Sequence, residues 1–200
     1  MKTYEINGHT VEFFPETHIY LVDGIVTPCV SDILKFKFND DYNGVSKEIL
    51  QRASEKGTEL HEAIENYEKN GIVSDLKEFK NYLFLKKHYG FENIANEVPI
   101  LYEKNGRVLF VGTLDQIIKM NEKRGINDFK RVFAPNREKI AYQLNLYKLG
   151  YEQSYKEQID FVSFTHLRED VRKFNPLPVN EEMALQLVED YLYSEEIDLC

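Results

Sequence analysis

The chain has 200 residues, of which 42% are hydrophobic and 13% aromatic, and its formal net charge is −9. This length and composition favour one folded domain with a substantial core, and they exclude the disordered, collagen-like and coiled-coil classes. The negative charge disfavours indiscriminate binding to phosphate backbones, but it is compatible with a site that concentrates carboxylates around a divalent metal.

Cysteine usage and hydropathy exclude several further classes. Cys29 and Cys200 are the two cysteines, so the chain cannot build a disulfide framework or an iron–sulfur cluster with four thiolates. The opening stretch lacks the apolar core of a signal peptide, and no run of about 18 apolar residues is present, so we expect a cytoplasmic protein without membrane contact. A Gly-x-x-x-x-Gly-Lys-Ser/Thr phosphate loop is also missing, so no nucleotide cofactor is expected.

Residues 1–30 are predicted to form a small N-terminal β-hairpin unit. Short β-prone runs in this region are separated by Asn-Gly, Pro and Asp-Gly, which are typical of tight turns. A short helix is expected over 30–34, with Ser31 as its N-cap.

Residues 45–90 are predicted to be helical. Apolar residues recur three and four positions apart over 45–71, where Gly71 would end the helix. A second helix is expected over 74–90, with Ser74 as its N-cap.

The hydrophobic period changes in residues 93–170. The pattern predicts three strands joined by two hairpin turns over 96–132, then a helix over 136–155 and a strand over 158–167, and the last helix is expected over 179–196. This order favours an α/β (α+β) fold: a central mixed β-sheet flanked by helices, in a single domain spanning 1–200.

An acid-x-lysine pattern lies in the third predicted strand. Side chains alternate along a strand, so Asp128 and Lys130 face the same side there. Such a pair suits metal-assisted hydrolysis, because the carboxylate holds Mg²⁺ or Mn²⁺ while the ammonium group orients water and stabilises developing negative charge. The same pattern at 75–77 and 78–80 falls within the second predicted helix, where residues two apart do not face each other, and is expected to be solvated helix surface.

Further polar residues are candidates for the same site. Asp115 interrupts a run that is apolar on both faces, and a buried carboxylate needs a partner or a metal, although Asp115 could instead mark a strand end that faces water. Asp128 on the neighbouring strand favours the metal. His61 and Glu97 could complete the metal shell; alternatively, His61 is a half-buried structural histidine and Glu97 an exposed strand-end charge.

Two other features remain open from the residues alone. Gln143 lies in the inward stripe of the predicted helix over 136–155, where it could cap a backbone group or lean toward Lys130 and a substrate phosphate. Aromatic and basic side chains also interleave in one segment and could stack on bases or pack in the core: Lys35, Phe36, Lys37, Phe38 and Tyr42.

Taken together, the segments GTELHEAIE, NEVPI, VGTLDQI, INDFK and QLNLY resemble, in order and spacing, the motifs of the PD-(D/E)XK nuclease superfamily. The resemblance is to its RecB-like and phage lambda-type exonuclease branch, and it covers roughly residues 18–151. It implies a restriction-endonuclease-like core and a DNA nuclease that uses one or two Mg²⁺ or Mn²⁺ ions.

The resemblance also implies roles for individual residues. Asp115 matches the metal-bridging aspartate, Asp128 the second acid and Lys130 the catalytic lysine. Gln143 and Tyr147 match a helical Gln-x-x-x-Tyr signature that positions the lysine or the DNA, and Tyr147 would contact substrate.

Other positions match metal ligands or substrate contacts. His61 and Glu97 would be additional metal ligands, together with the backbone carbonyl of Phe129. Lys139 and Arg131 would bind substrate, although Arg131 stands where the family often has Ser or Thr, and its role is not assigned.

The function that this resemblance implies is that of an exonuclease in phage or bacterial DNA recombination or repair. DNA is then the principal partner, a recombination or single-strand-annealing protein is a further candidate, and the compartment is the cytoplasm of a bacterial cell or phage-infected host. The alternatives are a structure-specific or single-strand endonuclease, or a catalytically inactive module of the same fold that binds DNA or protein. The sequence leaves the oligomeric state open.

Overall fold

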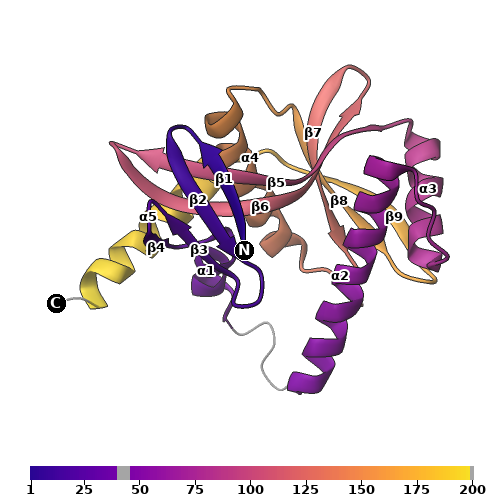
Figure 1. Ribbon diagram of the computed structural model, residues 1–200, viewed down its shortest axis with the longest axis horizontal. Coiled ribbons are helices and arrows are strands. Elements are labelled where there is room, and N and C mark those ends of the chain that lie inside the picture. The colour runs from indigo at the N-terminus through magenta and orange to yellow at the C-terminus, as the bar shows by residue number, and fades with distance from the viewer. Residues whose placement is uncertain (40–45, 199–200) are drawn as a thin grey trace.

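A computed structural model describes residues 1–39 and 46–198, without the side chains of residues 47, 49–54 and 195–198. The fold is mixed α/β, as predicted, with two sheets flanked by helices (Figure 1). Tyr42, one of the aromatic residues considered for base stacking, lies outside the described residues. In the described part of the chain, every helix is too short or too polar to cross a bilayer.

The predicted N-terminal β unit is confirmed as a four-stranded antiparallel sheet in the order β1-β2-β3-β4. Its strands are β1 (Lys2–Ile6), β2 (His9–Phe14), β3 (Ile19–Val22) and β4 (Ile25–Thr27). Asn7-Gly8 and Asp23-Gly24 make the first and last turns, with φ angles of 53° and 84° and of 51° and 80°. Both turns therefore have the left-handed backbone that Asn-Gly and Asp-Gly favour in two-residue hairpins.

The first helix, α1 (Val30–Lys37), is longer than predicted and has a different N-cap. Cys29 rather than Ser31 occupies the cap, and Oδ2 of Asp32 accepts a hydrogen bond of 3.1 Å from the Cys29 backbone N–H. The arrangement is a capping box, in which the Cys29 side chain faces the backbone N–H of Asp32 where Ser or Thr is usual, and Sγ of Cys29 also donates a hydrogen bond of 3.1 Å to Oδ2 of Asp32. Ser31 lies inside the helix instead, because the carboxylate of Asp32, three residues after Cys29, accepts the Cys29 N–H and fixes the start of the helix there.

The helical region contains α2 (Lys47–Asn70) and α3 (Lys77–Tyr89). Leu76, not Ser74, is the N-cap of α3, and Oγ of Ser74 accepts a hydrogen bond of 3.2 Å from the Leu76 N–H before the helix begins. The prediction that residues 78–80 are solvated surface is wrong for Glu78, which is 4% exposed. Its carboxylate is buried because it pairs with Arg131, a residue far along the chain.

The second sheet has five strands in the order β5-β6-β7-β8-β9. Its strands are β5 (Glu92–Lys104), β6 (Arg107–Met120), β7 (Lys123–Lys130), β8 (Phe161–Leu167) and β9 (Arg172–Leu177). The three-strand meander over β5, β6 and β7 is confirmed. Strands β7 and β8 are parallel and the other neighbours antiparallel, so the sheet is mixed, and α4 (Arg137–Tyr155) makes the crossover that a parallel pair requires.

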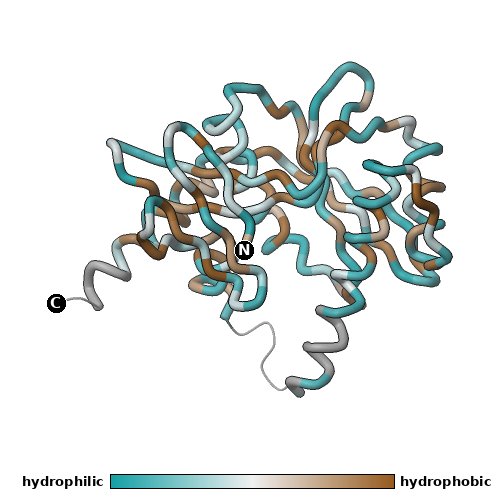
Figure 2. Tube along the Cα trace, viewed as in Figure 1, coloured by the Kyte–Doolittle hydropathy of each residue, from teal (hydrophilic) through white to brown (hydrophobic). Residues whose placement is uncertain are grey.

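Helices cover both faces of the five-stranded sheet (Figure 1). Helix α4 packs on β5 to β8, and α1 and α5 (Glu181–Asp198) pack against α4, while α3 contacts β8 and β9 and α2 contacts β5. Two hydrophobic clusters correspond to these two faces, and a third joins the N-terminal sheet to β5 and β6. Figure 2 shows the hydrophobic residues concentrated within the packed strands, with a hydrophilic turn between β6 and β7.

Strands β6 and β7 pair only along part of their length. Their ladder runs from Met120 opposite Lys123 to Gln116 opposite Asn127, and beyond that pair the strands diverge. Asp115 and Asp128 are the first residues past this fork. The fork places two acids side by side and frees backbone groups that would otherwise bond across the ladder.

Gly112 lies where β6 passes close to two helices. A Cβ atom at Gly112 would lie 3.2 Å from Tyr147 on α4 and 3.2 Å from Val30 on α1, so the absence of a side chain at Gly112 allows this close approach.

Candidate metal centre

Asp115 is the central acid of the candidate site. Its side chain is 14% exposed, and Oδ2 accepts a hydrogen bond of 2.8 Å from the backbone N–H of Phe129 on β7. That N–H can turn toward Asp115 because β6 and β7 have already diverged there. The expectation that Asp115 needs a partner therefore holds, and part of the partnership is a backbone group.

His61 reaches Asp115 from α2. Its Nε2 lies 3.6 Å from Oδ2 of Asp115, and its Nδ1 lies 4.0 Å from Oε1 of Glu97. The imidazole also packs edge-on against the Phe129 ring, with 5.4 Å between the ring centroids. Phe129 thus fixes the site twice, through its N–H on Asp115 and through its ring on His61.

Glu97 faces Asp115 across the β5–β6 ladder. Asn96 pairs with Gln116 and Val98 with Leu114, so Glu97 stands opposite Asp115, but its φ of 51° takes it out of the regular strand conformation. Burial, and then the charge of Asp115, raise the pKa of the Glu97 carboxyl. Two carboxylates this close are unfavourable without a cation between them.

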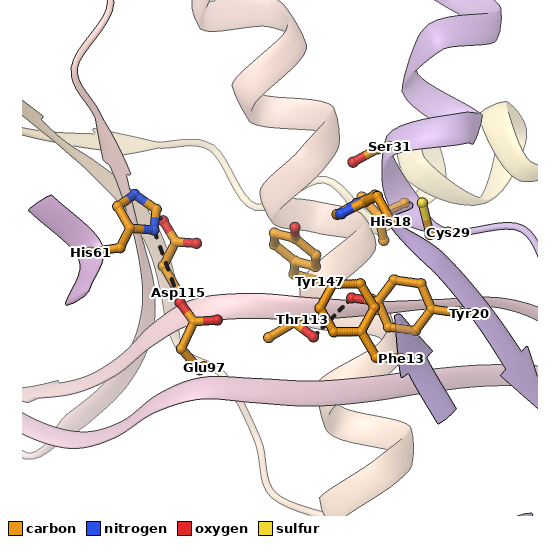
Figure 3. Close-up of a pocket in the computed structure, with 12 residues that line it drawn as sticks. Phe13, His18, Tyr20, Cys29, Ser31, His61, Glu97, Thr113, Asp115 and Tyr147 are labelled. Atoms are coloured by element: carbon orange, nitrogen blue, oxygen red, sulfur yellow. Dashed lines mark hydrogen bonds and ion pairs between the residues drawn. The ribbon is translucent and has the colours of Figure 1, made fainter. Parts of the chain in front are cut away.

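The donor set fits a divalent metal ion. One ligand atom from each of His61, Glu97 and Asp115 lies within 4.8 Å of the other two, and all three side chains are partly exposed. An imidazole nitrogen with two carboxylate oxygens suits Mn²⁺ and similar ions, and the carboxylates alone suit Mg²⁺. Figure 3 shows the three side chains converging from separate elements.

Asp128 lies beside this group and is engaged differently. Its carboxylate is almost fully buried, and Oδ2 lies 2.5 Å from Nζ of Lys130, with no other hydrogen-bond partner for Oδ2 among the described residues. Burial raises the pKa of Asp128, whereas Lys130 opposes the shift. The predicted pairing of Asp128 with Lys130 is present. The metal contact of Asp128 stays a prediction, because the group of described residues whose ligand atoms converge consists of His61, Glu97 and Asp115.

Gln143 and Tyr147 lie one turn apart on α4. Tyr147 lines the cavity of the three ligand candidates, and Gln143 lines the cavity beside Lys130. Nε2 of Gln143 donates a hydrogen bond of 3.3 Å to Oη of Tyr147 rather than to a backbone group. Gln143 also lines a cavity of about 370 Å³ together with Lys130 and Lys139. Gln143 therefore lies on the side of Lys130, and its contact with a substrate phosphate stays a prediction.

Arg131 pairs with Glu78 of α3 rather than with Asp115 or Asp128. Its Nε donates a hydrogen bond of 2.8 Å to Oε1 of Glu78, and its Nη2 also contacts that oxygen. The sequence suggested a substrate contact for Arg131, but its guanidinium compensates a buried carboxylate on α3. Lys139, the other basic residue proposed to bind substrate, lies over Phe38 at 6.0 Å from the ring centroid.

The sequence also missed residues at this site. A cavity of about 210 Å³ is lined by the three ligand candidates and, on its other side, by Phe13, His18 and Tyr20 of the N-terminal sheet (Figure 3). These side chains lie 41 or more positions from His61 in sequence. The turn signals that predicted the small sheet carry no information about where it docks.

The sequence matches no family model and no curated protein. One solved structure that is similar to this chain is the crystal structure of SSO0001, with a TM-score of 0.49 and 17% sequence identity, covering 84% of this chain and 75% of that chain. So distant a likeness carries no functional information.

Proposed function

We propose that the protein is a divalent-metal-dependent DNA nuclease of the PD-(D/E)XK type. The observation that carries the proposal is the convergence of His61, Glu97 and Asp115 at the β6–β7 fork, beside the Asp128–Lys130 pair. The motif resemblance supports it, since the matched segments are the ones that supply these side chains. The central mixed sheet with its crossover helix is compatible with it.

Each group has a role in phosphodiester hydrolysis. His61, Glu97 and Asp115 would hold Mg²⁺ or Mn²⁺, which supplies Lewis-acid stabilisation of phosphate charge and lowers the pKa of a bound water. Lys130, 22% exposed, offers an ammonium group to the phosphate or to the attacking water. Gln143 and Lys139 line the same cavity as Lys130 and would contact the phosphate backbone.

An exonuclease is the favoured form of this activity. The runner-up is a structure-specific or single-strand endonuclease, and a third possibility is an inactive module that only binds DNA or protein. An exonuclease and an endonuclease of this type would use the same metal centre. They would differ in whether they cleave at a DNA end or at an internal phosphate.

A digest of end-labelled linear DNA and of covalently closed circular DNA, with Mg²⁺, Mn²⁺ or a chelator, separates these alternatives. We expect the linear DNA to be degraded with either metal and spared with chelator, and the closed circles to survive. Absence of cleavage in both metals would refute the nuclease proposal. Nicking of the closed circles would refute its exonuclease form.

Lys130→Met provides the matched test of the active site. The variant should lose cleavage and retain Mn²⁺ binding, because Lys130 is not among the ligand candidates. Lys87→Met, an exposed lysine at the end of α3, is the control and should cleave like the wild type. Full activity in Lys130→Met would remove Lys130 from the mechanism.

A further inference from the structure

The cavity that contains the ligand candidates has two chemically different sides. His61, Glu97 and Asp115 form a charged side, and the N-terminal sheet supplies an aromatic side made by Phe13 and Tyr20 of the strands and His18 of the β2–β3 turn. Figure 3 shows the two sides facing the same space, with Tyr147 and Thr113 between them. The metal chemistry proposed above uses the charged side alone.

The aromatic side is an ordered cluster. The rings of Phe13 and Tyr20 are stacked, with 4.4 Å between centroids and 20° between planes, and His18 meets both edge-on at 5.5 and 5.9 Å. Tyr20 is buried and covers one side of Phe13, which remains partly exposed and lines the cavity. The ring of Phe13 and the exposed imidazole of His18 therefore offer aromatic surface to whatever enters.

The aromatic cluster is held in a defined position relative to the candidate metal ligands. Oη of Tyr20 forms a hydrogen bond of 2.9 Å with Oγ1 of Thr113, two residues before Asp115 on β6. An isolated β-bridge between the backbones of Cys29 and Val111 also joins the end of the N-terminal unit to the same strand. A ligand group on the aromatic side would thus sit at a fixed distance from a phosphate on the charged side.

The chemistry of the aromatic side favours a base over a phosphate. Partial burial lowers the pKa of His18, which favours the uncharged imidazole. Phenyl and imidazole rings stack on nucleobases without sequence preference, because every base has a π-face. A base within a duplex is already stacked on its neighbours, so the base that binds here must be unpaired.

We propose that Phe13, His18 and Tyr20 form a binding site for one unpaired nucleobase, adjoining the phosphate that the metal centre cleaves. The inference rests on the proposed nuclease function and specifies its substrate: single-stranded DNA, or a duplex end whose last base is unpaired. The N-terminal sheet is then part of the substrate site, and Phe13 and His18 are positioning residues.

The proposal is tested by binding without cleavage. Single-stranded oligonucleotides carry the fluorescent base 2-aminopurine at one position each, scanned from both ends, and are titrated with full-length protein in Ca²⁺ in place of Mg²⁺. One position should change its fluorescence on binding. In Phe13→Leu and His18→Ala that response should fall and binding should weaken, by about tenfold for Phe13→Leu, whereas Phe13→Tyr should retain both.

Phe84→Leu is the matched control. Phe84 is a partly exposed phenylalanine on α3 that stacks on His88, outside this cavity, so its replacement should leave the signal unchanged. His18 lies in an exposed turn. The His18→Ala variant therefore provides a second test of the base site if Phe13→Leu does not fold. Binding of fully paired, blunt duplex as tightly as single strands would overturn the proposal.

The outcomes also separate this inference from the nuclease function. If the wild type cleaves DNA and both Phe13→Leu and His18→Ala keep the wild-type fluorescence response, the base site is wrong and the nuclease stands. If the wild type never cleaves DNA but the position-specific response is lost in the variants, the base site stands and the nuclease is wrong. No binding of any oligonucleotide would overturn both.

Discussion

At the scale of single residues, Glu97 is the member of the candidate metal centre with the most strained backbone and an unfavourable charge environment. Its φ of 51° is a left-handed conformation that residues other than glycine seldom adopt in a strand. It also faces the like charge of Asp115, which together with burial raises the pKa of Glu97. Strain and repulsion at one position are typical of a functional residue kept at some cost to stability.

Glu97→Gly should therefore stabilise the protein in chelator and abolish its response to metal. Glycine adopts the left-handed backbone freely, so we expect a net gain of about 1 kcal/mol in the free energy of unfolding, after the greater freedom of the unfolded chain is allowed for. Urea denaturation with and without Mn²⁺ measures both effects.

Asn105→Gly is the control for the backbone effect. Asn105 has a φ of 55° in the β5–β6 turn, away from the site, and its replacement should leave the stabilisation by Mn²⁺ intact. If Glu97→Gly gains as much stability from Mn²⁺ as the wild type does, Glu97 is not a ligand.

At the scale of elements, buried polar contacts hold α3 against the sheet. Arg131, just past the end of β7, pairs with Glu78 of α3, which is 4% exposed. Tyr82 of α3 also joins a hydrogen-bonded network of sheet side chains, which are Asn93, Gln116, Asn127, Ser163 and Thr165. Gln116 and Asn127 are the last paired residues before the fork. The network therefore holds the point at which the strands diverge, and with it the positions of Asp115 and Asp128.

Arg131→Met should destabilise the fold rather than weaken DNA binding selectively. Removing the guanidinium leaves the Glu78 carboxylate buried without its partner, which costs about 3–5 kcal/mol of unfolding free energy, and adding Glu78→Gln should restore part of it. Urea denaturation measures the loss, and Arg107→Met, exposed at the start of β6, should change stability by less than about 0.5 kcal/mol. An Arg131→Met protein with normal stability and weak DNA binding would support the substrate contact instead.

Most elements were predictable because their signals are local. Hydrophobic period and turn residues located the meander, α2 and α4, and the alternation of side chains paired Asp128 with Lys130. Strand β9 was missed because its sequence, RKFNPL, lacks a regular alternation of apolar and polar residues and contains Pro176, as an edge strand allows. The burial of Glu78 and the left-handed backbone of Glu97 depend on partners distant in sequence, so no local sequence pattern predicts them.

At the scale of the whole molecule, the N-terminal sheet is joined to the meander by His9 as well as by the third hydrophobic cluster. Nδ1 of His9 lies 2.6 Å from Oδ2 of Asp23, and Nε2 lies 3.1 Å from Oε2 of Glu103 on β5. Hydrogen bonds to Asp23 and then to Glu103 raise the pKa of His9. The docking of this sheet decides whether Phe13, His18 and Tyr20 face the metal ligands.

This link predicts a pH dependence of stability. Because the folded pKa of His9 is raised, its contribution is fully present below the unfolded value of about 6.5 and is lost as the pH rises through the folded value. The difference in unfolding free energy between the wild type and His9→Gln should therefore shrink as the pH rises above about 6.5. Urea titrations at a series of pH values measure it, and a difference that grows with pH would contradict the assignment.

The central claim is that the cluster around Asp115 holds a metal ion with which the protein cleaves DNA. The most direct test is the rate at which end-labelled single-stranded DNA is cleaved in Mn²⁺ by the wild type and by Asp115→Asn, whose amide oxygen can still accept the Phe129 N–H bond. The account predicts cleavage by the wild type, and a rate for Asp115→Asn no higher than that of the wild type in chelator. Equal cleavage by the two proteins, or none by the wild type, would contradict it.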